Sequence, residues 1–189
     1  QEEAKDESKE ESKKDDRELI SEFVEEFITY EGLLKSYQDP ENGNTYIELS
    51  DEDISKEFIY FAHIINGTVE AGLFKGSHID QAVIKFEKQF NSLNLVRVNT
   101  EYYFDPDSEL SRQSQSNISD SVIENFEITH KNEDENTYLI DITKLLKSDN
   151  LTKLKSEPRD YESDSFGVGS LSRSKTAISK IYNLSLIHI

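Results

Sequence analysis

Hydrophobic residues recur at helical spacing in one early segment: Leu19, Ile20, Phe23, Val24 and Phe27. Asp15 and Asp16 precede this segment and are suited to cap a helix N-terminus. The opposite face carries glutamates, which argue against contact with an anionic membrane surface. We therefore expect a short amphipathic helix that docks on its own domain.

After Tyr30 the apolar residues alternate with polar ones, as they do in strands. Four segments are predicted to form strands: residues 30–50 as a hairpin turning at Asn42-Gly43, residues 58–65, residues 82–104 as a hairpin turning at Asn91-Ser92, and residues 138–142. Residues 58–65 are apolar on both faces, which predicts a central strand. A short turn of helix is expected directly after residue 142.

A second apolar stripe at helical spacing predicts a helix near residues 108–126: Leu110, Ile118, Val122, Ile123 and Phe126. Asp105, Asp107 and Glu109 resemble the start of a calcium loop. Leu110 and Ser116, however, stand where such a loop needs Gly and Glu, so a helix N-terminus is the better interpretation.

These elements predict an α+β fold that is β-rich, with antiparallel hairpins and two short amphipathic helices. Composition and pattern divide the chain into five parts. They are residues 1–17 as a disordered acidic tether, 18–76 as a first β-hairpin unit, 77–157 as a second hairpin and helix unit packed on the first, 158–183 as a passage toward a further domain, and 184–189 as an adaptor-derived artefact.

Charge excludes several functions. The chain has 39 Asp plus Glu against 21 Lys plus Arg, a net charge of -18, so we expect no nucleic-acid partner. No apolar run is long enough to predict a membrane span. An acidic tether after a removed leader is common in exported bacterial proteins, which favours a periplasmic, cell-envelope or extracellular location. An acidic solubility tail of a cytoplasmic protein is the alternative.

Candidate chemistry is sparse, and we predict no catalytic, cofactor-binding or metal-ligating residue. The chain has no cysteine, and His63, His78 and His130 lack zinc-ligand spacing. Asp39 and Glu41 are better explained by turn formation than by calcium binding. The glycines of residues 65–78 do not form a phosphate-binding loop, since Gly76 is followed by Ser77.

Basic residues gather toward the end of the chain: Lys144, Lys147, Lys153, Lys155, Arg159, Arg173, Lys175 and Lys180. One interpretation of these residues is a basic patch on the surface. A solvated or internally ion-paired face is the preferred interpretation in a chain of this net charge.

Five segments in order resemble the N-terminal part of a family of secreted bacterial zinc-dependent metalloproteases: YEGLLKSYQ, NTYIELSDEDISKEFIYFAHI, VIKFEKQFNSLNLVRVNTEYYFD, SNISDSVIENFEI and YLIDITKLLKSD. The resemblance spans about Phe27 to Asn183. In that family two adjoining domains of unknown function precede a zincin-type catalytic domain. No H-E-x-x-H occurs in this sequence, so no catalytic residue of the family is carried onto it.

The resemblance implies an accessory region that assists folding, shields a cleft or holds substrate. Zinc is expected in the missing catalytic domain and not in this fragment. The partners implied are the catalytic domain of the same chain and a peptide or protein substrate of the parent. The alternative is a stand-alone binding module of the cell envelope, tethered by the acidic tail.

The last six residues, LSLIHI, are the translation of CTG TCT CTT ATA CAC ATC, a transposase end sequence used as a sequencing adaptor. We therefore expect Leu184 to Ile189 to be non-native and the gene to be truncated. A natural apolar strand is the other interpretation.

Overall fold

The computed structural model describes residues 19–69, 73–102, 107, 119–132, 135–152 and 171–182. Most regular structure there is strand: β1 Ile28–Tyr30, β2 Lys35–Gln38, β3 Thr45–Ser50, β4 Glu57–His63, β5 His78–Gln89, β6 Ser92–Arg97, β7 Ser121–Asn132 and β8 Thr137–Asp141. Two short helices, α1 Ile20–Phe23 and α3 Thr143–Leu146, and one 3-10 turn, η2 Arg173–Lys175, complete the described elements.

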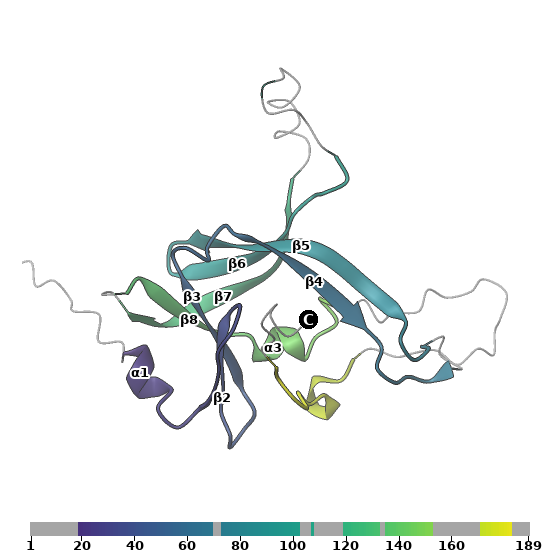
Figure 1. Ribbon diagram of the computed structural model, residues 1–189, viewed down its shortest axis with the longest axis horizontal. Coiled ribbons are helices and arrows are strands. Elements are labelled where there is room, and N and C mark those ends of the chain that lie inside the picture. Colours follow the sequence, from purple (N-terminus) through teal and green to yellow (C-terminus); the bar gives the residue numbers. More distant parts are fainter. Residues whose placement is uncertain are drawn as a thin grey trace, which may run out of the picture.

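All eight strands form one curled antiparallel sheet in the order β1-β2-β3-β8-β7-β6-β5-β4 (Figure 1). Strand β8 is the link between the two halves of the chain. It pairs with β3 on one side, for example Ile140 with Ile47, and with β7 on the other. The N-terminal hairpin is therefore joined to the rest of the sheet through a strand that lies about a hundred positions later in the sequence.

The core lies on one face of this sheet. Its fully buried side chains include Leu49 of β3, Leu93 of β6 and Ile140 of β8, each 0% exposed. Phe86 and Phe126 also lie in this cluster. On the other face, α1 covers a smaller cluster that Ile20 shares with Tyr46 and Leu139. Successive side chains of a strand point to opposite faces of the sheet, so each strand can contribute residues to both clusters.

The predicted hairpins are confirmed. Strands β2 and β3 surround the turn at Asn42-Gly43, where Gly43 has φ of +73°, and β5 and β6 surround the turn at Asn91. Strand β8 and helix α3 also lie where the pattern placed them. The first helix is shorter than its apolar stripe, since α1 ends at Phe23 and Ile28 already begins β1.

The α+β prediction is wrong, because the described structure is mostly β. Strand β7 occupies part of the segment expected to form the second helix, and Val122, Ile123 and Phe126 lie in it. Phe126 and Ile128 are buried with the exposed Glu127 between them, so the period here is two. Pairing with both β6 and β8 stabilises the strand over the helical alternative. Leu110 and Ile118, the other residues of that stripe, lie outside the described residues.

The position of β4 is a second correction. The segment expected to be a central strand lies at the edge of the sheet, where β4 pairs with β5 alone among the described strands. Only one face of β4 packs against the core, through Phe58. Ile59 and Phe61 on its other face remain 71% and 58% exposed, so apolar residues on both faces did not indicate burial on both faces. The division into residue ranges proposed from the sequence stays a prediction.

Candidate binding groove

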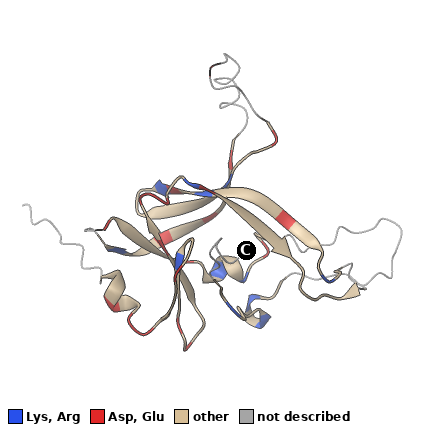
Figure 2. Cartoon of the chain, in the orientation of Figure 1, with Lys and Arg blue, Asp and Glu red and all other residues tan. Residues whose placement is uncertain are grey.

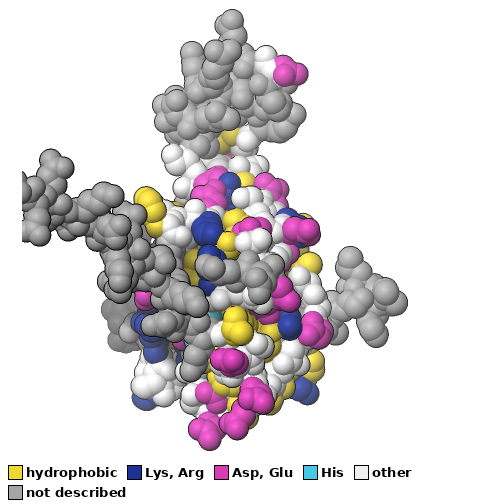
Figure 3. Space-filling model, turned by 90° about the vertical axis from the view of Figure 1, so that its left-hand side faces the viewer, with side chains coloured by type: hydrophobic (Ala, Val, Ile, Leu, Met, Phe, Trp, Pro, Cys, Tyr) yellow, Lys and Arg dark blue, Asp and Glu magenta, His cyan; other side chains and the backbone are white. Residues whose placement is uncertain are grey.

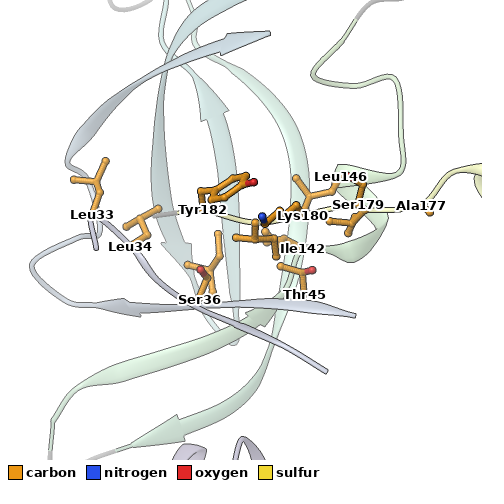
Figure 4. Close-up of a pocket in the computed structure, with 13 residues that line it drawn as sticks. Leu33, Leu34, Ser36, Thr45, Ile142, Leu146, Ala177, Ser179, Lys180 and Tyr182 are labelled. Atoms are coloured by element: carbon orange, nitrogen blue, oxygen red, sulfur yellow. The ribbon is translucent and has the colours of Figure 1, made fainter. Parts of the chain in front are cut away.

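A pocket of about 600 Å³ lies between β2, β3, the α3 region and residues 177–182 (Figure 4). Its lining combines aliphatic side chains with hydroxyls and one cation: Leu33, Leu34, Ser36, Thr45, Ile47, Ile142, Leu146, Ala177, Ile178, Ser179, Lys180, Ile181 and Tyr182. We call this pocket the groove, and residues 177–182 the strap. No Asp, Glu or His is among these lining residues.

Buried hydrogen bonds hold the wall of the groove in place. The Thr45 N–H donates to Thr143 Oγ1 at 2.8 Å, and the Thr143 N–H donates to Asp141 Oδ1 at 2.8 Å. Thr45 is 1% exposed and Thr143 is 6% exposed. Because both groups are buried and paired, β3 and the start of α3 form a rigid wall.

The strap lies along this wall without forming a strand. Upstream of it, the turn η2 is closed by a hydrogen bond from Thr176 Oγ1 to the Ser172 carbonyl at 2.9 Å. Within the strap, the Lys180 ammonium lies 4.5 Å from the centre of the Tyr182 ring. In Figure 4 Lys180 and Tyr182 extend between Leu34 on one side and Ile142 and Leu146 on the other. The strap is thus an extended segment seated against an apolar wall.

Basic residues lie in and next to α3 and in η2, the two elements beside the groove. Lys144 lies in α3 and Lys147 directly follows it, while Arg173 and Lys175 lie in η2 (Figure 2). Within the described part of the chain, none of these four forms an ion pair. Lys153, Lys155 and Arg159, which were grouped with them from the sequence, lie outside the described residues.

Strand β2 is fixed to β3 beside the groove by a polar network. The Tyr37 hydroxyl donates to Glu48 Oε2, and the Lys35 ammonium lies 3.5 Å from the same oxygen. A side-chain hydrogen bond with Tyr37 raises the pKa of Lys35 to about 12, and burial raises the pKa of Tyr37 to about 12. Both groups therefore keep their protons at neutral pH, and the network stays intact.

A comparable network ties β4 to β5 and β6. Asp80 of β5 accepts hydrogen bonds from Tyr60 and Arg97. Burial and the charge of Asp80 raise the pKa of Tyr60 to about 12. This network accounts for a buried carboxylate without requiring a ligand.

The histidines are arranged differently from what their spacing suggested. The pairing of β4 with β5 places His63 opposite His78, with ring centroids 5.3 Å apart, although each looked isolated in the sequence. His130 stacks on Phe23 at 4.0 Å. Among the described residues no group of three or more His, Asp or Glu side chains is placed to hold a metal ion.

The acidic turn residues have structural roles. Asp39 Oδ1 accepts a hydrogen bond from the Glu41 N–H at 2.8 Å, and Asp39 Oδ2 accepts one from the Asn42 side chain. This is the turn chemistry predicted for the hairpin. Asp105 and Glu109, also weighed as calcium ligands, lie outside the described residues.

Fold and groove together define a mostly β protein, a curled antiparallel sheet with an apolar groove that an extended segment lines on one side. The chain belongs to the family described as Domain of unknown function (DUF5117), whose model matches residues 76–186, more than half of the sequence. Searches of curated proteins and of solved structures gave no match. Of the helices in the described part of the chain, none has the length and apolar character of a membrane span.

Proposed function

We propose that this chain is the noncatalytic N-terminal accessory region of an exported zinc-dependent metalloprotease, and that its groove holds an extended segment of polypeptide. The groove carries the proposal. The strap, an extended segment, forms one side of an apolar pocket of about 600 Å³ whose other sides are β2, β3 and the α3 region. The Ser36 hydroxyl would orient backbone carbonyls beside aliphatic contacts. Thr45, which is buried and donates to the Gly43 carbonyl, would remain part of the wall.

The matched family region covers the strap, the segment that this proposal has the groove anchor. It begins just before β5 and runs through the strap, so it contains β5 to β8, helix α3 and the strap, whereas β2 and β3 precede it. If the resemblance to secreted zinc metalloproteases holds, residues 158–183 connect this region to the catalytic domain. In this account the groove anchors that passage, and anchoring would fix where the catalytic domain begins relative to the sheet.

The zinc chemistry is assigned to the downstream domain. In such enzymes two His of H-E-x-x-H bind the metal and the Glu acts as general base toward zinc-bound water. The motif does not occur in this sequence, and no step of that chemistry is derived from residues of this chain. What the chain supplies is a binding surface.

The second candidate is a stand-alone binding module of the cell envelope. The observation that favours it is the group of cations Lys144, Lys147, Arg173 and Lys175, none of which forms an ion pair within the described residues. Their charge would attract an acidic ligand to the groove. In that case the strap would be displaced by a separate partner rather than lead to another domain.

The complete gene distinguishes the two candidates. We expect its reading frame to continue past the codon of Asn183 into a helix with H-E-x-x-H, and its full product to cleave peptides with one zinc per chain. The chain of 189 residues alone should cleave nothing under the same conditions. A reading frame that ends without the motif would contradict the protease assignment and favour the binding module.

A further inference from the structure

Strand β4 is an exposed, apolar edge of the sheet. It runs for seven residues and pairs with β5 alone among the described strands. Ile59 and Phe61 are 71% and 58% exposed on its outer face, and Ile65 just beyond the strand is 86% exposed. Edge strands of this kind are templates for pairing with another chain unless charge, proline or a cover blocks them. Within the strand, the only charged side chain is that of Glu57.

The register shows which backbone groups of β4 are available. The Val98 N–H donates to the Val83 carbonyl, so Val83 of β5 directs its backbone groups toward β6 and away from β4. Its neighbour Ala82 directs them toward β4, where it faces Tyr60. Backbone groups alternate along a strand, so every second residue of β4 points outward. Those residues are Glu57, Ile59, Phe61 and His63.

The outward residues are self-complementary in an antiparallel pairing. If two copies of β4 meet about a twofold axis at Tyr60, Ile59 faces Phe61 of the second copy and Glu57 faces its His63. Each facing pair joins two residues with free backbone groups, so each would exchange two N–H···O bonds. Apolar residues meet apolar ones and the carboxylate meets the imidazole, both favourable cross-strand pairs. Tyr60 would face its own copy as a non-hydrogen-bonded pair.

We propose that the β4 edge is a homodimer interface, at which two copies of the chain pair β4 with β4 to form one continuous sheet. The register is the one centred on Tyr60. A register shifted by two residues toward either end would place Ile59 or Phe61 opposite itself and leave one end of the strand without a facing residue. The occupant of the edge is therefore a second copy and not an unrelated peptide.

The overall charge opposes this association, and that makes it sensitive to salt. Two copies at -18 each repel one another at low ionic strength. Salt screens that repulsion beyond about 10 Å at 0.1 M, whereas the backbone pairing at β4 is short-range. We expect dimerisation to strengthen several-fold when NaCl is raised from about 0.02 M to about 0.3 M.

The first experiment is sedimentation analysis of the 189-residue chain with variants of Ile59. Ile59→Pro removes an outward N–H and leaves the bonds to β5 in place, as proline on an edge strand does. We expect it to weaken dimerisation at least tenfold with a melting temperature close to that of the wild type. Ile59→Val keeps the N–H and the apolar contact and should dimerise like the wild type.

The second experiment tests the register. The chain contains no cysteine, so a single introduced cysteine gives a clean signal. Tyr60→Cys should form a disulfide-linked dimer under mild oxidation, because non-hydrogen-bonded facing residues have Cα atoms about 4.5 Å apart. Ala62→Cys is the matched control on the same face. It would lie opposite Phe58 of the second copy and should crosslink poorly.

Exchanging the charges at positions 57 and 63 distinguishes this pairing from nonspecific association. Glu57→Lys should weaken the dimer, and adding His63→Glu should restore it. A wild-type chain that stays monomeric at about 0.1 mM and 0.3 M NaCl would overturn the proposal. Equal crosslinking of Tyr60→Cys and Ala62→Cys would overturn it too, as would an Ile59→Pro variant that dimerises normally. Tight binding of an unrelated extended peptide by a monomeric chain would show that the edge serves another occupant.

Discussion

Thr143 joins two parts of the chain that lie 98 positions apart, through the hydrogen bond from the Thr45 N–H to its hydroxyl. Thr143→Val removes that acceptor and leaves a buried N–H unpaired. We expect a loss of about 1–3 kcal/mol in the free energy of unfolding, measured by urea denaturation. Thr143→Ser keeps the hydroxyl and should cost much less. Equal stability of the Val and Ser variants would show that this bond does not hold the groove wall.

Asp120 gives a pH-dependent test. A hydrogen bond from the Asn99 N–H lowers the pKa of Asp120, with burial opposing and Lys85 at 2.9 Å assisting. A lowered folded-state pKa contributes stability above the ordinary value of about 4, and that contribution is lost as pH falls toward the folded value. Asp120→Asn should therefore lower stability at pH 7 by no more than about 1 kcal/mol, since the pair is near the surface.

The difference between Asp120→Asn and the wild type should shrink as the pH falls below about 4, because the wild-type carboxyl then becomes neutral as well. Thermal melts from about pH 7 down to pH 3 check this. A difference that grows with acid would contradict the sign of the pKa shift.

At the scale of elements, two positions require glycine for different reasons, one because of its backbone φ and the other because of a close neighbour. Gly43, in the β2–β3 turn, has φ of +73° with nothing within 4 Å of an added Cβ. Gly67 has no such φ, but an added Cβ would lie 2.6 Å from the Leu73 carbonyl oxygen. Gly43→Ala should cost about 1 kcal/mol through backbone strain alone.

Gly43→Asn should cost less than Gly43→Ala, since Asn tolerates positive φ, and thermal melts would show it. Gly67→Ala should instead push Leu73 away by steric contact, and Gly67→Asn should be tolerated no better than Gly67→Ala. Its effect would appear as faster hydrogen exchange at the Leu73 N–H, which donates to the Thr68 carbonyl. Equal behaviour of Ala and Asn at position 43 would contradict the turn geometry.

Elements fixed by local chemistry could be predicted from the sequence, and those fixed by distant partners could not. The β2–β3 and β5–β6 hairpins carry their turn residues and alternation within a few positions. Strand β7 carries an ambiguous stripe, and its partners β6 and β8 decide between helix and strand. The edge position of β4 depends on which strand ends the sheet, and no local pattern encodes that.

The groove was not predicted at all, because its walls come from segments far apart in the sequence. Thr45 and Ile142 become neighbours only through the pairing of β3 with β8. The opposition of His63 and His78 likewise depends on a register shift between Ala62 and His63. In each case the sequence alone does not reveal how strands far apart in the chain are aligned with one another. The apolar residues of the strap, Ile178 and Ile181, were the local signal that something covers them.

At the scale of the whole molecule, groove and edge use different parts of the sheet. The groove is built on β2 and β3 near one edge, and β4 lies at the opposite edge. A dimer paired through β4 would leave both grooves open. The two proposals can therefore fail independently, since variants of Ile59 do not touch the groove and variants of Leu34 do not touch β4.

Net charge acts on the molecule as a whole. Acidic side chains gather on the face that Figure 3 shows, most densely at its lower end. At -18 this self-repulsion destabilises the compact state. We expect the melting temperature to rise when NaCl is raised from about 0.02 M to about 0.3 M, because screening weakens the repulsion. A melting temperature that falls over this range would mean that specific ion pairs outweigh it.

The central claim is that the groove seats the strap as extended polypeptide, and cleavage by trypsin after Lys180 tests it most directly. The reference is a free peptide of residues 171–182, in which nothing protects the bond between Lys180 and Ile181. Leu34→Asp places a charge in the groove wall and should release the strap. Phe90→Asp, at a turn where the side chain is 94% exposed, is the matched control.

We expect cleavage after Lys180 to be at least tenfold slower in the folded chain than in the peptide. It should approach the peptide rate in Leu34→Asp and stay slow in Phe90→Asp, with both variants folded by circular dichroism. Cleavage of the wild-type chain at the rate of the free peptide would contradict the account, because the strap would then not be held in the groove.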